Sequence, residues 1–241
     1  MLINDKVAVL LLCGGRGTRL GPDFKNTNKS LIRIKNKTLI SSNIDYLLKQ
    51  KFENIFVLTG HAYKKVEQEV KSKFKRKVIL NFTGLNTSIA MRIEKTLKFL
   101  DKFQYVLIMN GDSIYKFNLN KIFYQTCKKN IDCSLVCTSK IIKYGFVELN
   151  KKKMVKSFVK NIEFYNFFNK RSYLFYSGLC FVNIKLLKKN LKGIKKNFEI
   201  NLFNKLIKKN KTEVFFDKAE FRDFNNIDDI MDLKNKRLKS I

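Results

Sequence analysis

The sequence predicts an α/β fold in which a mixed, mostly parallel sheet is flanked by helices and carries a small antiparallel β lobe. Two observations lead to this prediction. Apolar runs of strand length alternate with segments of helical periodicity through the first half of the chain, which is typical of βαβ units. Further along, two alternating segments around residues 145–159 are typical of an antiparallel hairpin.

In the first half, Val7–Cys13 is a continuous apolar run, as expected of a strand that is buried on both faces. Further apolar runs predict strands over 54–59, 77–82 and 105–109. Between the strands, apolar residues recur at intervals of three or four, which predicts helices over 39–50, 64–74 and 88–100. The alternation of strands and helices is therefore continuous from residue 7 to residue 109.

The second half has a different rhythm. We expect helices over 119–128, 198–208 and 227–238, and strands over 133–138, 174–182 and 213–216. The segments 145–149 and 154–159 form the predicted hairpin, because Asn150-Lys151-Lys152 between them suits a turn. No repeat, proline-rich linker or shift in composition marks a boundary, so a single domain over residues 1–241 is expected.

Charge raises the first question about function. The 241 residues include 50 Lys and Arg against 20 Asp and Glu, a net charge of +30. Such an excess favours a polyanionic partner, since residues that neutralise phosphates supply much of the affinity for nucleic acid. However, 42 of the 50 are lysine and are scattered along the chain, whereas nucleic-acid readers favour the planar fork of Arg. We therefore attribute most of the charge to composition.

Two features indicate a cytoplasmic protein. No apolar run approaches the ~18–20 residues that span a bilayer, and Val7–Cys13 is too short and badly flanked for an export signal. The five cysteines are odd in number and show no Cys-x-x-Cys spacing, which is typical of reduced thiols. The composition and length thus exclude a collagen, a disulfide scaffold and an integral membrane protein.

The segment LLCGGRGTRLGP (residues 11–22), directly after the first strand, is the strongest local signal. Gly14, Gly15 and Gly17 allow backbone N–H groups to approach a ligand closely. Thr18 and Arg19 add a hydroxyl group and a fixed positive charge, which suit a polyphosphate. The spacing is that of neither a Walker A loop nor the G-x-G-x-x-G fingerprint. The loop follows a parallel strand, and α/β folds bind ligands at the carboxyl edge of the sheet.

Two acidic residues also follow strands. Asp112, in Asn110-Gly111-Asp112-Ser113, could hold Mg²⁺ through one carboxylate oxygen, although the same residues also make an ordinary turn. Asp223, in FRDFNNIDD (221–229), could act in the same way or could cap the following helix.

Taken together and in order, these segments resemble the sugar-phosphate nucleotidyltransferases. GGRGTRLGPDFKNTNKSLIRI (14–34) is similar to the opening GGxGTRLxPxTxxxPKPL of that family. NGDS (110–113) stands where the family has Gly-Asp, and YSGLCFV (176–182) where it has N-[AG]-G-x-[FY]. FRDFNNIDD replaces its W-x-D-[IM]-G-T-P-E-D pattern, and the likeness covers essentially the whole chain.

The resemblance implies a Rossmann-like fold, with a nucleotide-binding half over about 1–115 and an acceptor-binding half over about 116–241. It implies Mg²⁺-dependent transfer of a nucleoside monophosphate to a phosphorylated acceptor, with release of pyrophosphate, for the synthesis of cell-surface polysaccharide precursors. The implied catalytic residues are Arg19, Lys29, Asp112 and Asp223, and the two aspartates would hold the metal. The implied nucleotide-binding residues are Leu12, Gly14, Gly15, Arg16, Gly17, Thr18, Thr83, Gly84, Thr87, Asn110 and Gly111. The implied acceptor-binding residues are Gly145, Lys160, Tyr176, Gly178 and Glu199.

FTGLNTSIAMRIEKTLKFL (82–100) resembles the TGxxTxTGGRIKR stretch of glucose-1-phosphate cytidylyltransferases, which favours CTP as the donor. Departures from the family pattern leave the acceptor open between a hexose, a heptose and a small non-sugar phosphate. Asn28 replaces the proline before Lys29, Tyr176 replaces an Asn, and Ala90-Met91 replaces a Gly-Gly pair.

Two other classes of protein remain as alternatives. A metal-dependent glycosyltransferase of related architecture would also place an Asp at a strand end, but it would not need the GGxGTRL loop. A nucleic-acid-binding protein would bind DNA or RNA in a salt-sensitive manner that does not depend on Arg19 or Asp112.

Overall fold

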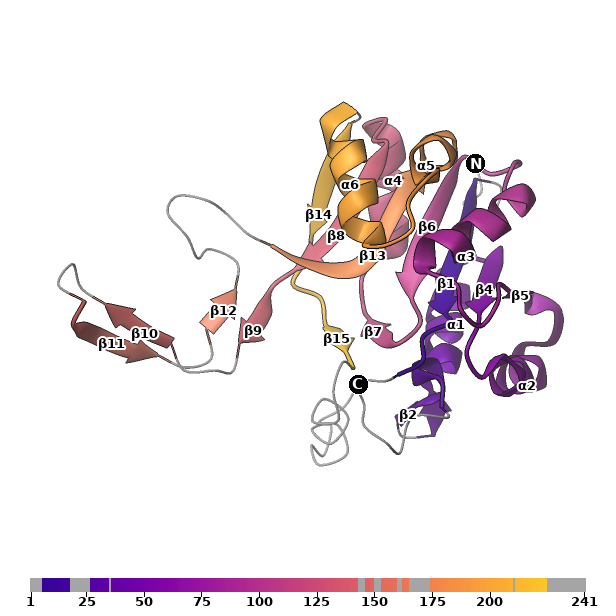
Figure 1. The fold of residues 1–241 in the computed structure, drawn as a ribbon, viewed down its shortest axis with the longest axis horizontal. Helices are drawn as coiled ribbons and strands as arrows, with labels where there is room; N and C mark the ends of the chain where they lie inside the picture. The colour runs from indigo at the N-terminus through magenta and orange to yellow at the C-terminus, as the bar shows by residue number, and fades with distance from the viewer. Residues whose placement is uncertain are drawn as a thin grey trace.

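The computed structural model describes residues 6–17, 27–34, 36–142, 146–149, 153–159, 162–164, 174–209 and 211–224. Its centre is a seven-stranded sheet (Figure 1) in the order β14-β8-β13-β6-β1-β4-β5. The strands are β14 (Thr212–Phe216), β8 (Cys133–Thr138), β13 (Phe175–Asn183), β6 (Tyr105–Asn110), β1 (Val7–Cys13), β4 (Ile55–Thr59) and β5 (Val78–Phe82). Within this sheet, β13 is the one antiparallel strand. The sheet is therefore mixed and mostly parallel, as predicted.

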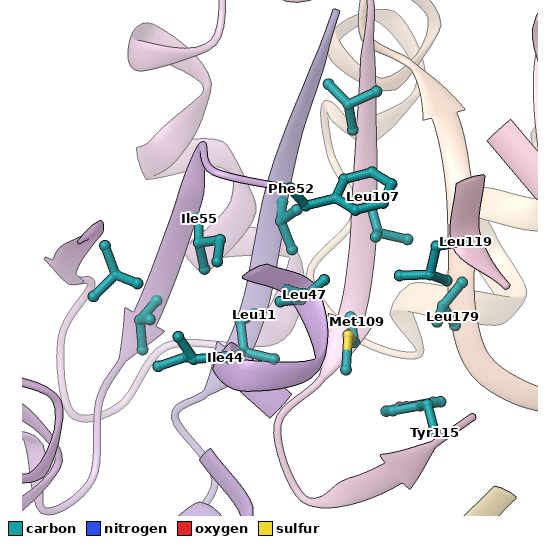
Figure 2. Packing of buried hydrophobic residues seen from close by; sticks show 14 of the residues in the cluster. Leu11, Ile44, Leu47, Phe52, Ile55, Leu107, Met109, Tyr115, Leu119 and Leu179 are labelled. Carbon is teal, nitrogen blue, oxygen red and sulfur yellow. The ribbon is translucent and has the colours of Figure 1, made fainter. Parts of the chain in front are cut away.

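Helices cover both faces of the sheet and bury its side chains. Helices α1 (Leu39–Lys49), α2 (Tyr63–Phe74) and α4 (Leu119–Lys128) pack on one face, and α3 (Ile89–Thr96), α5 (Ile184–Leu191) and α6 (Phe198–Lys209) on the other. Successive residues of β1 alternate between the two cores: Leu11 packs with Ile44 and Leu47 of α1, as Figure 2 shows, whereas Leu10 faces the opposite helices. This alternation explains why the sequence of β1 is apolar throughout.

Several short elements lie beyond the carboxyl end of β6 or pack beside it. Strand β7 (Ser113–Tyr115) follows β6 and pairs antiparallel with β15 (Phe221–Asp223), so that Asp223 lies opposite Ser113. The 3₁₀ helix η4 (Lys29–Leu31) leads into a small hairpin of β2 (Arg33–Ile34) and β3 (Lys37–Thr38). Buried Phe224 packs with Ile32 and Leu39, which holds β15 against η4 and α1. The carboxyl-terminal stretch thus returns to the end of the first strands.

The predicted hairpin is confirmed. Strands β10 (Phe146–Leu149) and β11 (Val155–Val159) pair antiparallel with an irregularity after Glu148, and β9 (Lys140–Ile142) pairs with β12 (Ile162–Phe164). These four strands extend away from the large sheet (Figure 1).

The other predicted strands are confirmed to within a residue or two, and the helices need three comments. The segment predicted as one helix over 88–100 is α3 followed by the 3₁₀ turn η6 (Leu97–Phe99), and a second 3₁₀ turn, η5 (Lys75–Lys77), follows α2. Helix α5 was not predicted; it is short and is capped by the side chain of Asn183. The helix predicted over 227–238 lies outside the described residues. None of the helices in the described ranges is both long and apolar enough to span a bilayer.

Candidate functional site

A cleft of about 1060 Å³ lies at the carboxyl ends of β1, β5 and β6. Four stretches and two single side chains form its walls. The lining residues are Leu12 in β1 and Gly14, Gly15, Arg16 and Gly17 after it, residues 85–89 after β5, Asn110 at the end of β6 and Asp112 after it, residues 195–200 at the start of α6, and Lys29 and Arg92. The structure therefore brings the glycine-rich loop and the NGDS turn to one cleft, as expected of the carboxyl edge of a parallel sheet.

Two residues of the glycine-rich loop disfavour a side chain, each for a different reason. A Cβ atom on Gly14 would lie 2.2 Å from Cζ of Arg92. Gly17 has a φ of 66°, in the left-handed region that disfavours residues with a Cβ atom. Gly15 and Arg16 are exposed on the cleft side, and Arg16 donates a hydrogen bond to Asn86 in the loop after β5. Thr18 and Arg19, which complete the predicted motif, lie outside the described residues.

Asn28 fastens Lys29 to the glycine-rich loop. Its buried amide nitrogen donates to the carbonyl oxygens of Cys13 at 2.7 Å and His61 at 2.8 Å. Its amide oxygen accepts from the backbone N–H and the hydroxyl group of Ser30, at 3.0 and 2.8 Å, and so caps η4. The side chain uses all of its hydrogen-bonding capacity, because an amide has two donor hydrogens and two acceptor lone pairs.

Lys29 and Asp112 face one another in the cleft. Nζ of Lys29 lies 3.8 Å from Oδ2 of Asp112 and donates to the carbonyl oxygen of Phe224 at 3.2 Å. Burial raises the pKa of the Asp112 carboxyl, and the negative charge of Asp223 raises it further, whereas Lys29 acts in the opposite direction. A cation beside Asp112 therefore favours its ionised form, because the cation offsets the negative charge of Asp223.

The turn that presents Asp112 is held from below. Nδ2 of Asn43, a buried residue of α1, donates to the carbonyl oxygens of Ser113 at 2.9 Å and Gly111 at 3.3 Å. Gly111 lies so close to β1 that a Cβ atom would be 2.4 Å from Sγ of Cys13. The register of β7 and β15 then places Asp223 beside the turn. Two elements more than a hundred residues apart thus bring the two acidic residues together.

The pair Asp112 and Asp223 fits Mg²⁺. This ion is bound in proteins by one or two carboxylates and completes its octahedral shell with waters and substrate phosphates. The described part of the chain holds no group of three or more His, Cys, Asp and Glu side chains arranged for a metal.

The other predicted site residues lie in different places. Glu199 and Thr87 line the cleft, whereas Thr83 is buried behind it and donates to the carbonyl oxygen of Thr59 at 2.7 Å. Gly84, Gly111, Tyr176 and Gly178 are not among the residues that line the cleft. Gly145 and Lys160 lie outside the described residues.

Tyr176 and Gly178 belong to an irregularity of β13 beside the cleft. The register of β13 against β8 shifts between Tyr176 and Leu179, and Gly178 has a φ of 77°. A Cβ atom on Gly178 would lie 2.4 Å from Nδ2 of Asn110, so this glycine makes room for a side chain that does line the cleft. The ring of Tyr176 packs edge-on against Phe203, with ring centroids 5.3 Å apart.

Several contributors to the site had little or no signal in the sequence. Asn43 reads as an ordinary polar position in an amphipathic helix. Lys195 and Lys196 read as part of a lysine-rich surface segment, yet they line the cleft. Asn28 departs from the family pattern, which has proline at this position, but that departure does not predict its hydrogen bonds.

A family model described as nucleotidyl transferase matches residues 8–240. A D-glycero-α-D-manno-heptose 1-phosphate guanylyltransferase of Campylobacter jejuni is 30% identical over 156 residues, which are 64% of this chain and 68% of that protein.

Two solved structures share the fold. A putative glucose-1-phosphate thymidylyltransferase of Bacillus anthracis has a TM-score of 0.75 at 15% identity, covering 98% of this chain and 96% of that one. HddC of Yersinia pseudotuberculosis, in complex with GMP-PN, has a TM-score of 0.67 at 19% identity, covering 95% and 98% of the two chains. The chain therefore belongs to the nucleotidyl transferase family, and sugar-phosphate guanylyltransferases are among its relatives.

Proposed function

We propose that this protein transfers a nucleoside monophosphate from a nucleoside triphosphate to the phosphate of a sugar 1-phosphate and releases pyrophosphate. The observation that carries this proposal is the contact between Lys29 and Asp112, 3.8 Å apart, in a cleft that the glycine-rich loop also lines. Backbone N–H groups of the loop suit phosphate oxygens, and the neighbouring lysine and carboxylate suit a phosphate with a metal ion.

The chemistry needs positioning and charge neutralisation more than proton transfer. A phosphate oxygen of the acceptor forms a bond to the α-phosphorus. The bond from that phosphorus to the oxygen that bridges the α- and β-phosphorus atoms breaks, and pyrophosphate leaves with the electron pair. The attacking oxygen is already ionised, so no general base is required. Lys29, inside the cleft, would stabilise the charge that develops on the phosphates, and Arg19 remains predicted to assist it.

We further propose that Asp112 and Asp223 hold Mg²⁺ when the nucleotide is bound. The metal would neutralise phosphate charge and orient the α-phosphate. The two carboxylates must be ionised for this role. Binding of the metal would lower the pKa of Asp112, which burial raises in its absence.

As the donor nucleotide we propose GTP, with CTP as the second candidate. The heptose 1-phosphate guanylyltransferase and the GMP-PN complex support GTP. The likeness to cytidylyltransferases rests on residues 82–100, and within it the hydroxyl group of Thr83 donates to Thr59 and accepts from Arg92. A buried hydroxyl so engaged holds the loop together and is not available to read a base. The exposed residues that could face the base are Leu85, Asn86 and Ile89.

As the acceptor we propose a heptose 1-phosphate, or a related hexose 1-phosphate such as mannose 1-phosphate. Lys195 and Lys196 line the cleft and could pair with the phosphate of the acceptor, and Glu199 could accept hydrogen bonds from sugar hydroxyl groups. The product would be a nucleotide sugar for cell-surface polysaccharide. All five cysteines are free thiols, which agrees with the proposed place in the cytoplasm.

A substrate screen tests this proposal. GTP, CTP, UTP, ATP and dTTP are each incubated with Mg²⁺ and a panel of heptose and hexose 1-phosphates, and pyrophosphate release is measured. We expect release that requires both substrates and is fastest with GTP. If CTP is the one nucleotide of the panel that supports release in the presence of an acceptor, the protein is a cytidylyltransferase. If no combination releases pyrophosphate but a nucleotide sugar is consumed, the glycosyltransferase alternative is correct.

A further inference from the structure

We propose that Arg92 is a positioning residue for the nucleotide, and that its guanidinium group orients the peptide between Gly14 and Gly15 so that the N–H of Gly15 faces the cleft. The inference rests on the proposed function, since it assigns a role in nucleotide binding. Arg92 lies in α3, and the guanidinium group reaches the carboxyl ends of three parallel strands.

The contacts of Arg92 join three segments that converge on the cleft. Nη2 donates to the carbonyl oxygen of Gly14 at 3.1 Å, after β1. Nη1 donates to the carbonyl oxygen of Thr59 at 2.9 Å, at the end of β4, and to the hydroxyl oxygen of Thr83 at 3.0 Å, after β5. Arg92 is only 5% exposed, so these bonds form in a site from which water is largely excluded. The planar fork of Arg suits acceptors held in such fixed directions.

The charge of Arg92 is unusual for a core position. Within the described ranges, no carboxylate oxygen lies within ion-pair distance of its guanidinium group. Burial accordingly lowers the pKa of the guanidinium group, although arginine remains charged at neutral pH. A buried cation without a counter-ion is costly, and this one borders the cleft that we assign to a triphosphate. An anionic ligand would supply the missing negative charge.

The geometry of the peptide bond explains how Arg92 could act on the nucleotide. The C=O of Gly14 and the N–H of Gly15 belong to one peptide unit, and in a trans peptide they point in opposite directions. The described residues contain no cis peptide. Since the carbonyl oxygen of Gly14 is held by Arg92 and by the N–H of His61 at 3.3 Å, the N–H of Gly15 is directed away from the protein interior. Gly15 is exposed and lines the cleft, where this N–H can donate to a phosphate oxygen.

The glycines around Arg92 show how little room its guanidinium group has. A Cβ atom on Gly60 would lie 2.1 Å from Nη1 and 2.5 Å from Nη2 of Arg92. Gly60 is not among the residues that line the cleft, and its φ is not in the left-handed region. The substitution Gly60→Ala therefore displaces the guanidinium group of Arg92 although no residue that lines the cleft is itself substituted. It is an independent way to disturb Arg92.

The experiment measures KM for the donor, KM for the acceptor and kcat for Arg92→Lys, Arg92→Gln and Gly60→Ala, with thermal unfolding as a check on folding. We expect KM for the donor to rise at least ~10-fold in all three, because misplacement of a binding group by about 1 Å can cost that much or more. KM for the acceptor is expected to change less than about 2-fold. Arg92→Lys tests the fork, since it keeps the charge but cannot reach three acceptors in fixed directions.

The matched control is Lys95→Gln. Lys95 lies nearly one turn further along α3 and donates to the carbonyl oxygen of Thr83 at 2.9 Å, but no contact joins it to Gly14 or Thr59 in the described structure. The control is expected to keep KM for the donor within about 2-fold of the wild type. The double variant Arg92→Gln/Gly60→Ala should be no worse than Arg92→Gln, since the clash has lost its partner.

The outcomes separate the inference from the proposed function. If the wild-type protein releases no pyrophosphate with any substrate pair, the proposed function fails, and binding of a fluorescent GTP analogue then tests Arg92 alone. If Arg92→Lys binds the donor like the wild type, charge suffices and the positioning role is wrong. The role is equally overturned if Gly60→Ala is folded and leaves KM for the donor unchanged, and this variant decides the matter if the Arg92 variants do not fold.

Discussion

Replacement of Asn28 tests whether the buried hydrogen bonds beside Lys29 hold the site together. The variant Asn28→Ala removes the amide and with it four hydrogen bonds: two to the carbonyl oxygens of Cys13 and His61, and two from the N–H and hydroxyl of Ser30. The backbone is free to remain as it is, because φ of −79° and ψ of 133° suit alanine.

The expected loss of stability follows from these four bonds. A buried hydrogen bond contributes about 1 kcal/mol net, and water that enters the space left by the amide recovers part of it. We therefore expect Asn28→Ala to lower the free energy of unfolding by about 2–4 kcal/mol. Since Lys29 follows directly in η4, kcat should fall as well, by about 10-fold or more.

Asn28→Pro restores the residue that the family pattern has at this position, and it gives a second magnitude. A φ of −79° lies within the range of proline, so the ring itself fits. Proline loses the same side-chain bonds, but it restricts the unfolded chain, which returns about 0.4–1 kcal/mol. Asn28→Pro should therefore be more stable than Asn28→Ala by about that amount and still less stable than the wild type.

Stability is measured by urea unfolding at neutral pH. In a separate assay, kcat is measured as pyrophosphate release with saturating substrates. The ordering wild type, Asn28→Pro, Asn28→Ala is the expected result. Two results would show that the buried bonds contribute nothing. One is a free energy of unfolding for Asn28→Ala equal to that of the wild type, and the other is an Asn28→Pro variant that matches the wild type in both stability and kcat.

Two further predictions concern stability and shape. Burial alone would raise the pKa of Glu69, but hydrogen bonds from Lys73, Thr38 and Ser41 outweigh it and lower the pKa to about 2. The stabilising effect of the ionised Glu69 is thus complete above the unfolded pKa of 4.5 and is lost as the pH falls toward 2. In urea unfolding, Glu69→Gln should lower the free energy of unfolding by about 1–3 kcal/mol at pH 7 and by markedly less at pH 3. An equal loss at both pH values would contradict this prediction. Gly178→Ala should lower kcat/KM about 10-fold, because its Cβ atom displaces Asn110. The control Gly193→Ala has a similar φ of 80° and no atom near its Cβ, so it should cost only about 1–2 kcal/mol of backbone strain. Equal values of kcat/KM for the two variants would show that the contact with Asn110 does not matter.

Much of the fold could be predicted because periodicity reports burial directly. The strand Val7–Cys13 is apolar throughout since residues on both of its faces are buried, and the loop after it must lie at the carboxyl edge of a parallel sheet. The antiparallel direction of β13 and its position between β6 and β8 were not predicted, because strand order depends on packing between distant segments.

The site was predicted less completely, for a related reason. Glycine spacing and strand-end aspartates carry a local signal, and the loop, Lys29 and Asp112 indeed share one cleft. Thr83 was predicted to contact the nucleotide, but its hydroxyl group is directed into the protein toward Thr59. Arg92 acts on Gly14, which is far away in the sequence, and no local pattern encodes such a contact.

We propose that this cleft carries out nucleotidyl transfer with Asp112 at its metal site. The most direct measurement is pyrophosphate release by the wild-type protein and by Asp112→Ala, with GTP or CTP, Mg²⁺ and a sugar 1-phosphate. We predict release by the wild type that depends on both substrates, and a loss of about 10³-fold or more in kcat/KM for Asp112→Ala. Near-normal turnover by Asp112→Ala would show that Asp112 holds no metal that the reaction needs.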